Sequence, residues 1–348
     1  MKHAWTYRSK KGALSFQTPY RSIAILLGLF LLLIGSVFAG GSLGETIISP
    51  LDVLSTIVGT SNGEHDFILM TLRLPRTIVA LLVGMALGLA GALLQSMVRN
   101  PLASPDILGV TAGASFAAVA FLSLSDGRFS IAWLPVAAVF GALATSVLLY
   151  LLSWKNGLQP IRLVLIGIGL SAVLGAGTTF FLVMGDMYTA SQVYVWLTGT
   201  VYGATWDDVL VILFPLLLCL PFVLILARSL AVQELGEDVA KGLGNPVQVH
   251  RVLLLLLSII LAGVAVAVAG AIGFIGLLAP HIARRWLSFS FTSMVISSAF
   301  IGGLLMFGAD MIARNAFYPL DVPAGVFTAS IGAPFFLILL FRHRNRMV

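Results

Sequence analysis

Charged residues and cysteine are both scarce in this sequence. Only 10% of its 348 residues are charged and 59% are hydrophobic, and the mean hydropathy is +1.03, which is too apolar for a soluble globular protein. The one cysteine, Cys219, lies in an apolar run, so a disulfide within the chain and a cysteine-based metal site are both excluded. We therefore expect a membrane protein with several crossings.

A Gly-Lys dipeptide is also absent, and with it the phosphate-binding loop of a Walker A motif. We predict that the chain is not an enzyme, does not hydrolyse ATP itself and has no cofactor. The histidines are too scattered to form any of the usual spacings of metal ligands. They are His3, His65, His250, His281 and His343.

Long continuous apolar runs dominate the sequence. A transmembrane β-barrel would need short segments of alternating polarity, which these runs are not. At about 20 residues for each crossing, the length allows roughly eight to eleven helices. We predict an all-α polytopic membrane protein of about ten transmembrane helices. The predicted crossings are 23–39, 75–97, 107–124, 131–153, 163–184, 209–227, 252–271, 276–286, 295–314 and 325–341.

The basic N-terminus, followed by the apolar run 23–39, could be a secretory signal peptide. The run is long enough to span a bilayer, however, and no clear cleavage site of small residues follows it. We interpret it as the first membrane helix. The predicted organisation is a cytoplasmic tail over 1–22, one transmembrane domain over 23–341 and a second cytoplasmic tail over 342–348.

The positive charges test this topology. The formal net charge of +6 would suit a nucleic-acid partner, but 16 of the 20 lysines and arginines fall in segments predicted to be cytoplasmic. Such a bias is typical of a protein of the cell membrane with both termini inside, and we predict no nucleic-acid partner. The basic residues predicted to lie outside are Arg73, Arg76, Arg128 and Arg314.

The segment 72–113 carries the most distinctive pattern. Arg73 and Arg76 are three residues apart, so a helix with Pro75 in its first turn presents both side chains on one face at its mouth. Closely spaced glycines and alanines then allow neighbouring helices to approach. Arg99-Asn100-Pro101 should end this helix, because proline cannot continue it.

Several motifs together resemble the permease subunits of ABC importers for iron-siderophore complexes and vitamin B12, the FecCD type. They are LRLPR, LVG-x-ALGLAGALLQ, RNPLA-x-P-x-ILG, GFIGLLAPHIAR, AD-x-x-AR and TASIGAPFF, and they extend from Arg73 to near the C-terminus. The resemblance implies the type II importer permease architecture, in which two ten-helix permeases form the pore. The implied partners are ABC ATPase subunits inside, a second permease that is a copy or a paralogue, an external substrate-binding protein, and membrane lipid.

The resemblance also implies that Arg73, Arg76 and Arg314 dock glutamates of the binding protein. Arginine suits this role, because its planar fork binds a carboxylate through two hydrogen bonds and stays charged. The alternatives are anchors for lipid headgroups or an internal pair with Asp310, which lies four residues from Arg314 on the same helix.

By the same resemblance, residues 233–250 form the coupling loop that enters a cleft of the ATPase. Its glycines and Pro246 should divide it into two short helical pieces. The family usually has Ala-Arg-x-Leu-Gly where this chain has AKGLG, which leaves the individual contacts open; a solvated connector is the alternative. The expected contacts are Leu235, Val239, Lys241, Leu243 and Gly244.

We predict an apolar pore wall formed mainly by the helix 163–184, because a bulky ligand must slide along it without being held tightly. The candidate pore-lining residues are Gly167, Ser171, Gly175 and Thr178. The predicted function is the inward transport of a ferric siderophore by alternating access, with vitamin B12 or haem as the alternative cargo.

An intramembrane protease and a gradient-driven transporter are the alternatives from other classes of protein. Ser115 in a Gly-x-Ser pattern, with His281 as base, could suggest an intramembrane protease, but Ser115 lies in a run of small residues that pack helices. A gradient-driven transporter usually places ionisable residues at mid-membrane. Here the predicted helix interiors carry almost none, and Asp310 is the nearest candidate.

Overall fold

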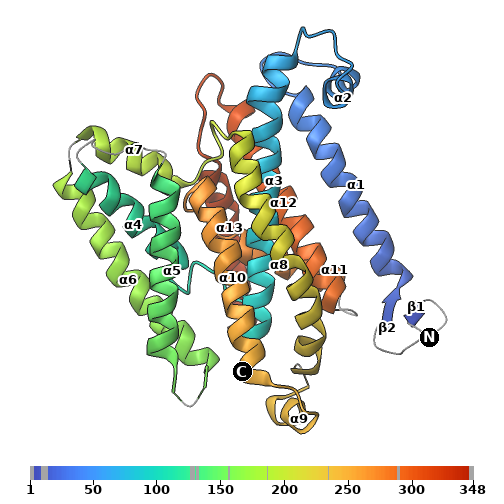
Figure 1. Ribbon diagram of the computed structural model, residues 1–348, viewed down its shortest axis with the longest axis vertical. Coiled ribbons are helices and arrows are strands. Elements are labelled where there is room, and N and C mark those ends of the chain that lie inside the picture. The colour runs from blue at the N-terminus through green and yellow to red at the C-terminus, as the bar shows by residue number, and fades with distance from the viewer. Residues whose placement is uncertain are drawn as a thin grey trace.

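The computed structural model describes residues 4–8, 15–125, 130, 133–155, 157–185, 187–233, 235–287 and 291–344, which form an almost entirely helical bundle (Figure 1). The first half contains α1 (Tyr20–Ser42), α2 (Pro50–Val58), the π-helix η1 (Ile68–Arg73), α3 (Leu74–Val98), α4 (Val110–Ser125), α5 (Leu134–Ser153) and α6 (Pro160–Met184). The second half contains α7 (Met187–Thr198), α8 (Trp206–Gln233), α9 (Glu237–Gly242), α10 (Val247–Ala269), α11 (Ile275–Trp286), α12 (Phe291–Ala316) and α13 (Ala324–Arg344).

Seven of the described helices are long and apolar enough to cross a membrane, which confirms the polytopic helical fold. They are α1, α3 with η1, α5, α6, α8, α10 and α12. The shorter apolar helices α4 and α13, together with the 12-residue α11, occupy the other three predicted crossings. The number of ten crossings and the boundaries of the two tails stay predictions.

A short antiparallel hairpin precedes the bundle and was not predicted from the sequence. Strand β1 (Ala4–Arg8) pairs with β2 (Ser15–Pro19), with Ala4 opposite Pro19 and Arg8 opposite Ser15. It lies at the end of α1 that is remote from α2 (Figure 1). Among the described residues these are the only strands, so the exception to the all-α prediction is confined to the predicted N-terminal tail.

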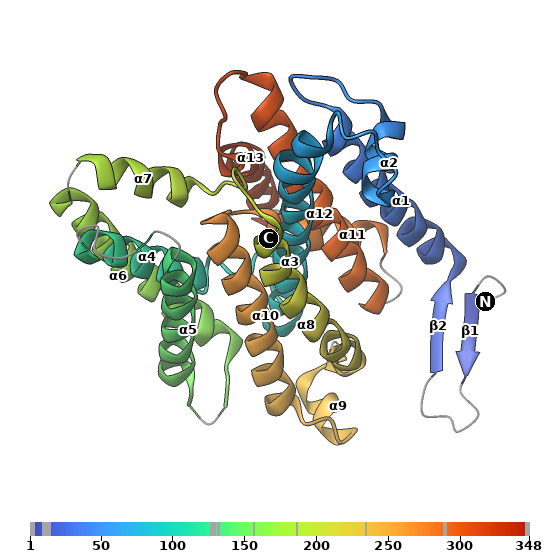
Figure 2. The same cartoon turned by 45° about the horizontal axis from the view of Figure 1, so that its top comes forward.

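Helix α3 lies at the centre of the molecule, between α10, α12 and α8 (Figure 2). In its most apolar stretch 89% of the residues are buried, compared with 11% in α6. Small residues make this possible: a Cβ atom added to Gly91 would lie 1.8 Å from the carbonyl oxygen of Gly276 in α11, and one added to Gly84 would lie 2.2 Å from that of Gly302 in α12. The predicted close approach of neighbouring helices is therefore observed.

This central helix begins earlier than predicted but ends where predicted. Helical structure begins at Ile68 rather than Pro75, because η1 continues directly into α3. At the other end α3 stops where predicted: Arg99 adopts the left-handed conformation, with φ 56°, and the side chain of Asn100 accepts a hydrogen bond from the amide of Leu102. In the segment 233–250 the structure has one short helix, α9, instead of the two expected pieces.

Replacing Gly91 with alanine should destabilise the bundle, because the new methyl group would overlap the backbone of α11. We expect a loss of about 1–3 kcal/mol, the usual cost of overpacking a well-packed interior. Gly35→Ala in α1 is the matched control, because nothing lies within 4 Å of its added Cβ. Thermal unfolding of the detergent-solubilised protein would measure both; equal transition temperatures for the two variants would contradict the prediction.

Candidate functional site

The three arginines predicted to dock a binding protein meet at one end of the bundle. Arg73 and Arg76 come from the start of the central helix and Arg314 from the end of α12, and all three line one pocket of about 480 Å³. The connection between α1 and α2, that between α7 and α8, and that between α12 and α13 complete it. The remaining lining residues are Gly44, Glu45, Thr46, Ile68, Leu72, Tyr202, Asn315, Tyr318, Pro319, Leu320 and Asp321.

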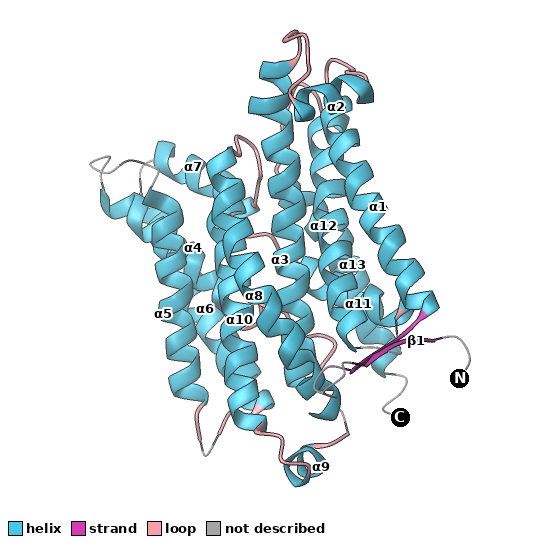
Figure 3. Cartoon of the chain, turned by 45° about the vertical axis from the view of Figure 1, so that its right-hand side comes forward, coloured by secondary structure: helices cyan, strands magenta, loops and turns pink. Residues whose placement is uncertain are grey.

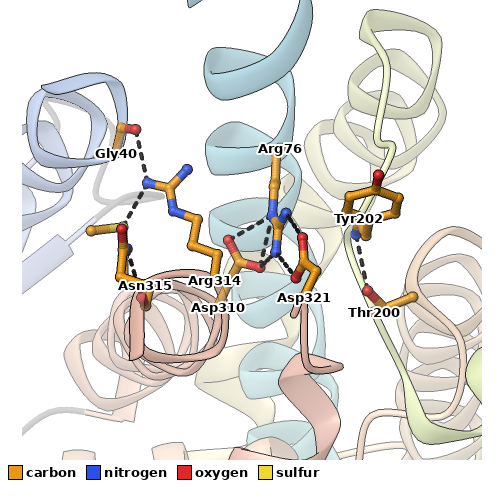
Figure 4. Close-up of polar contacts among 9 residues, drawn as sticks. Gly40, Arg76, Thr200, Tyr202, Asp310, Arg314, Asn315 and Asp321 are labelled. Atoms are coloured by element: carbon orange, nitrogen blue, oxygen red, sulfur yellow. Dashed lines mark hydrogen bonds and ion pairs between the residues drawn. The ribbon is translucent and has the colours of Figure 1, made fainter. Parts of the chain in front are cut away.

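Arg76 forms ion pairs with two carboxylates at this pocket, which we call the outer pocket because the arginines predicted to lie outside gather there. Its Nη2 lies 2.8 Å from Asp310 Oδ1 in α12 and 2.8 Å from Asp321 Oδ1 in the α12–α13 connection, and Nε also donates to Asp310 (Figure 4). The ring of Tyr202 stacks on the guanidinium with its centroid 5.6 Å from Cζ. Arg76 is only 8% exposed, so two carboxylates hold its charge inside the protein.

Arg73 is held by backbone instead of by carboxylates. Its Nη1 donates to the carbonyl of Gly41 at 2.8 Å, and its Nη2 donates to the carbonyl of Thr46 at 2.7 Å and to the Thr46 hydroxyl at 3.1 Å. Arg73 is likewise 8% exposed. It therefore fastens the chain after α1 onto the start of α3.

Arg314 does not form the hydrogen-bonded pair with Asp310 that sequence spacing allowed, because that carboxylate is engaged by Arg76. Its Nη2 donates to the carbonyl of Gly40 at 2.8 Å (Figure 4). Its Nε is buried and has no hydrogen-bond partner among the described residues. Of the three arginines Arg314 is the most exposed, since the other two are buried.

Glu45 and Asp321 line the pocket with the three arginines, and Asp310, although not part of its lining, binds Arg76; the chain itself thus supplies three carboxylates for the three cations. An incoming carboxylate would have to displace internal partners of Arg73 or Arg76, whereas Arg314 offers a partly exposed guanidinium. Sequence reasoning missed Asp321 and Tyr202. Neither lies on the same element as an arginine, so no local spacing could have indicated them. The docking role stays a prediction for all three arginines.

The predicted coupling loop lies at the opposite end of the molecule (Figure 1). Leu235, Val239 and Leu243 are 66%, 49% and 67% exposed around α9, an unusual density of apolar side chains on a polar loop. Gly244 follows with φ 76°, a conformation that favours glycine. Lys241 is also exposed and pairs with Glu237 at 3.0 Å.

Glu237 connects this loop to the body of the protein. Its carboxylate binds Lys241 on one side and the buried Arg251 of α10, at 2.7 Å, on the other. The hydrogen bonds from these two cations hold the pKa of Glu237 below its usual range. Arg251 also donates to the carbonyl of Leu158, and the Leu158 amide donates to Gln248 at 2.9 Å. The loop is thereby linked to the α5–α6 connection.

The predicted pore residues all lie on α6 but in different surroundings. Gly167 is buried against the backbone of Ile107 and Leu108, and the Thr178 hydroxyl donates to the carbonyl of Leu174 in its own helix. Ser171 is partly exposed, and nothing lies within 4 Å of a Cβ added to Gly175. Gly167 therefore serves packing within the chain, and a place in the pore wall stays a prediction for all four residues.

Replacing Arg76 with glutamine should destabilise the outer end strongly, because Asp310 would keep a buried charge without its partner. We expect a loss of about 3–5 kcal/mol. Adding Asp310→Asn should restore much of it, since the remaining group is then neutral and able to hydrogen-bond. Asp321→Asn is the control with a smaller loss, because the Asp321 side chain is 28% exposed. Thermal unfolding measures all four proteins, and a wild-type transition for Arg76→Gln would refute the assignment.

Comparison with known proteins adds the family to this geometry. The profile of the FecCD transport family matches residues 29–342. The chain is 47% identical over 327 residues to the "Probable siderophore transport system permease protein YfhA" of Bacillus subtilis (strain 168), covering 91% of this chain and 95% of that protein. It is 43% identical over 345 residues to the achromobactin transport system permease protein CbrC of Dickeya dadantii (strain 3937), covering 99% and 98%.

A solved structure agrees with these relatives. It shows an inward-facing conformation of a transporter assigned to the metal-chelate type of ABC transporter, with 30% sequence identity and a TM-score of 0.79 over 92% of this chain and 99% of that one. The family match covers most of the chain, and the relatives align with it over nearly their whole length. The chain therefore belongs to the FecCD transport family, the membrane permease subunits of ABC importers.

Proposed function

We propose that this chain is the permease subunit through which a ferric siderophore complex crosses the cell membrane inward by alternating access. The observation that carries the proposal is the full-length likeness to permeases of siderophore and ferric-chelate systems. The geometry supports it with two specialised ends: a charged pocket at one end of membrane-length helices and an exposed apolar loop at the other.

The apolar loop suits an ABC ATPase as its partner. Leu235, Val239 and Leu243 would enter a cleft of that subunit, and the Glu237–Arg251 pair would pass the movement to the α5–α6 connection. The β1–β2 hairpin, which precedes α1, lies at the same end of the molecule as α9 (Figure 3). Because lysine and arginine are concentrated there, we place both termini and the loop in the cytoplasm.

A second permease subunit would cover α6. This helix is as apolar as a membrane span but is the least buried of the seven, so much of its surface faces either lipid or another protein. Pairing two copies, or this chain and a paralogue, across α6 would enclose a path beside Ser171 and Gly175. The two kinds of pair fit this surface equally well.

An external binding protein would dock at the outer pocket with carboxylates. Arg314 would receive such a group at the lowest cost, because it is the most exposed of the three and no carboxylate is hydrogen-bonded to it among the described residues. Arg73 and Arg76 would chiefly shape the pocket around it. Vitamin B12 or haem is the second candidate cargo, but the named relatives favour iron complexes. The family match and the permease relatives disfavour a gradient-driven carrier and a protease.

Uptake measurements test the cargo and the docking together. A strain that lacks the gene should lose uptake of at least one class of radiolabelled ferric siderophore, and the wild-type gene should restore it. Arg314→Glu should reduce the restored uptake about tenfold or more, because like charges then oppose the docking carboxylate. Asn62→Glu is the control, since it adds the same charge at an exposed position of the α2–η1 connection outside the pocket. Undiminished uptake of every siderophore without the gene would refute the cargo.

Replacing Leu243 with aspartate should impair binding of the ATPase without impairing folding of the permease. The side chain is 67% exposed, so folding should be unaffected, whereas a charge in the ATPase cleft would be desolvated. We expect the ATPase subunits to be lost from the purified complex and uptake to fall by about tenfold or more. Leu51→Asp, exposed on α2 at the other end, should keep the ATPase bound. Normal co-purification with Leu243→Asp would contradict the role of the loop.

A further inference from the structure

A cavity of about 500 Å³ lies between the two halves of the chain and contains a carboxylate, that of Asp106. It is formed by the α3–α4 connection, the start of α4, the α10–α11 connection and α13. Most of its wall is apolar, with Ile107, Phe274 and Phe336 among its side chains. Besides the carboxylate, its polar side chains are the hydroxyls of Ser104, Thr111 and Ser115.

The cavity lies midway along the helices, although Asp106 belongs to a connection. Ser258 lies in the middle of α10 and donates to the carbonyl of Ala90 at 3.0 Å. Ala90 of α3 is therefore level with the middle of α10. The neighbouring Gly91 packs on Gly276, and a Cβ on Gly276 would lie 3.0 Å from Pro105. Asp106 is thus at mid-depth in a bundle of membrane-spanning length, where an ionisable residue indicates a functional site.

The carboxylate is held in place but carries no counter-charge. Thr111 donates its hydroxyl to Asp106 Oδ1 at 2.8 Å, and the backbone amide of Phe274 donates to the same side chain. No ion pair joins it to a basic residue within the described ranges. Phe274 has φ 67°, which is rare for an aromatic residue, and its ring packs against Gly332 of α13. A carboxyl group with a fixed position therefore faces an apolar cavity.

The same connection borders the helix proposed to line the route. A Cβ on Gly109 would lie 3.2 Å from the Ser171 hydroxyl, and one on Gly167 would lie 2.7 Å from the carbonyl of Ile107. The connection that carries Asp106 and Ile107 thus packs on α6, against Gly167 and the buried hydroxyl of Ser171. A ligand in the cavity would meet the carboxyl group of Asp106 and the rings of Phe274 and Phe336.

We propose that this cavity binds a positively charged organic group, a protonated amine or a guanidinium, on an otherwise apolar cargo. The inference rests on the proposed transport function and adds a preference for cationic chelates. One carboxylate and three hydroxyls give too few oxygen ligands for a bare divalent metal, which prefers six or more. The described residues also contain no group of three or more histidine, cysteine or acidic side chains that could hold a metal ion. An organic cation needs only one carboxylate, and the phenyl rings accommodate both its charge and its apolar body.

Binding to the complete importer in lipid nanodiscs tests the site directly. The probes are radiolabelled 2-phenylethylammonium and its neutral analogue 2-phenylethanol. The wild type should prefer the cation, and Asp106→Asn should weaken cation binding about tenfold or more while leaving the alcohol unchanged. Asp207→Asn, at an exposed position of α8, is the matched control and should keep the preference.

A second variant tests the site in case Asp106→Asn does not fold. Ala112 lines the same cavity, so Ala112→Lys would neutralise the carboxylate from inside and should also abolish the preference for the cation. Equal binding of the two probes to the wild type, or unchanged cation binding in both variants, overturns the inference even if siderophore uptake depends on the gene. Selective cation binding without uptake of any ferric chelate supports the site and overturns the proposed cargo instead.

Discussion

The close backbone approach of α3 to α11 and α12 is the constraint on which the structure depends. Lipid is as apolar as the side chains it would replace, so membrane helices gain little from the hydrophobic effect when they associate. Glycines at 84 and 91 remove the side chains that would keep the backbones apart. Because α3 is thereby buried on nearly all sides, the outer arginines at its start and the turn at its end are fixed relative to four neighbouring helices.

The two ends of the molecule differ in which side chains they bury. At the outer end the chain buries two cations, Arg73 and Arg76, partly buries Arg314, and balances all three with carboxylates and carbonyl oxygens of its own. At the other end it leaves leucine and valine side chains in water around α9. The first arrangement makes a rigid surface, and the second leaves an apolar surface that another protein can cover.

Sequence patterns were reliable where one local cause decides the structure. Pro101 ended α3 at the predicted place, and the apolar runs gave the helices, because length and hydrophobicity suffice for that. Contacts between remote segments were missed or misassigned. Sequence spacing offered a pair of Asp310 with Arg314 as an alternative to docking, yet the partner of Asp310 is Arg76, 234 residues away. Asp106 was not predicted, because it lies outside the helix interiors, in a connection that the fold brings to mid-depth.

The junction at Arg76 has a consequence for how the outer side can open. Asp310 belongs to α12, Asp321 to the connection that leads into α13, and one guanidinium holds both. Any movement that separates α13 from α3 must break the bond between Arg76 and Asp321, whose side chain is 28% exposed, whereas the pair with Asp310 is buried. Ions in the medium screen exposed pairs far more than buried ones. Added salt should therefore weaken the Arg76–Asp321 link while it leaves the Arg76–Asp310 pair nearly unchanged.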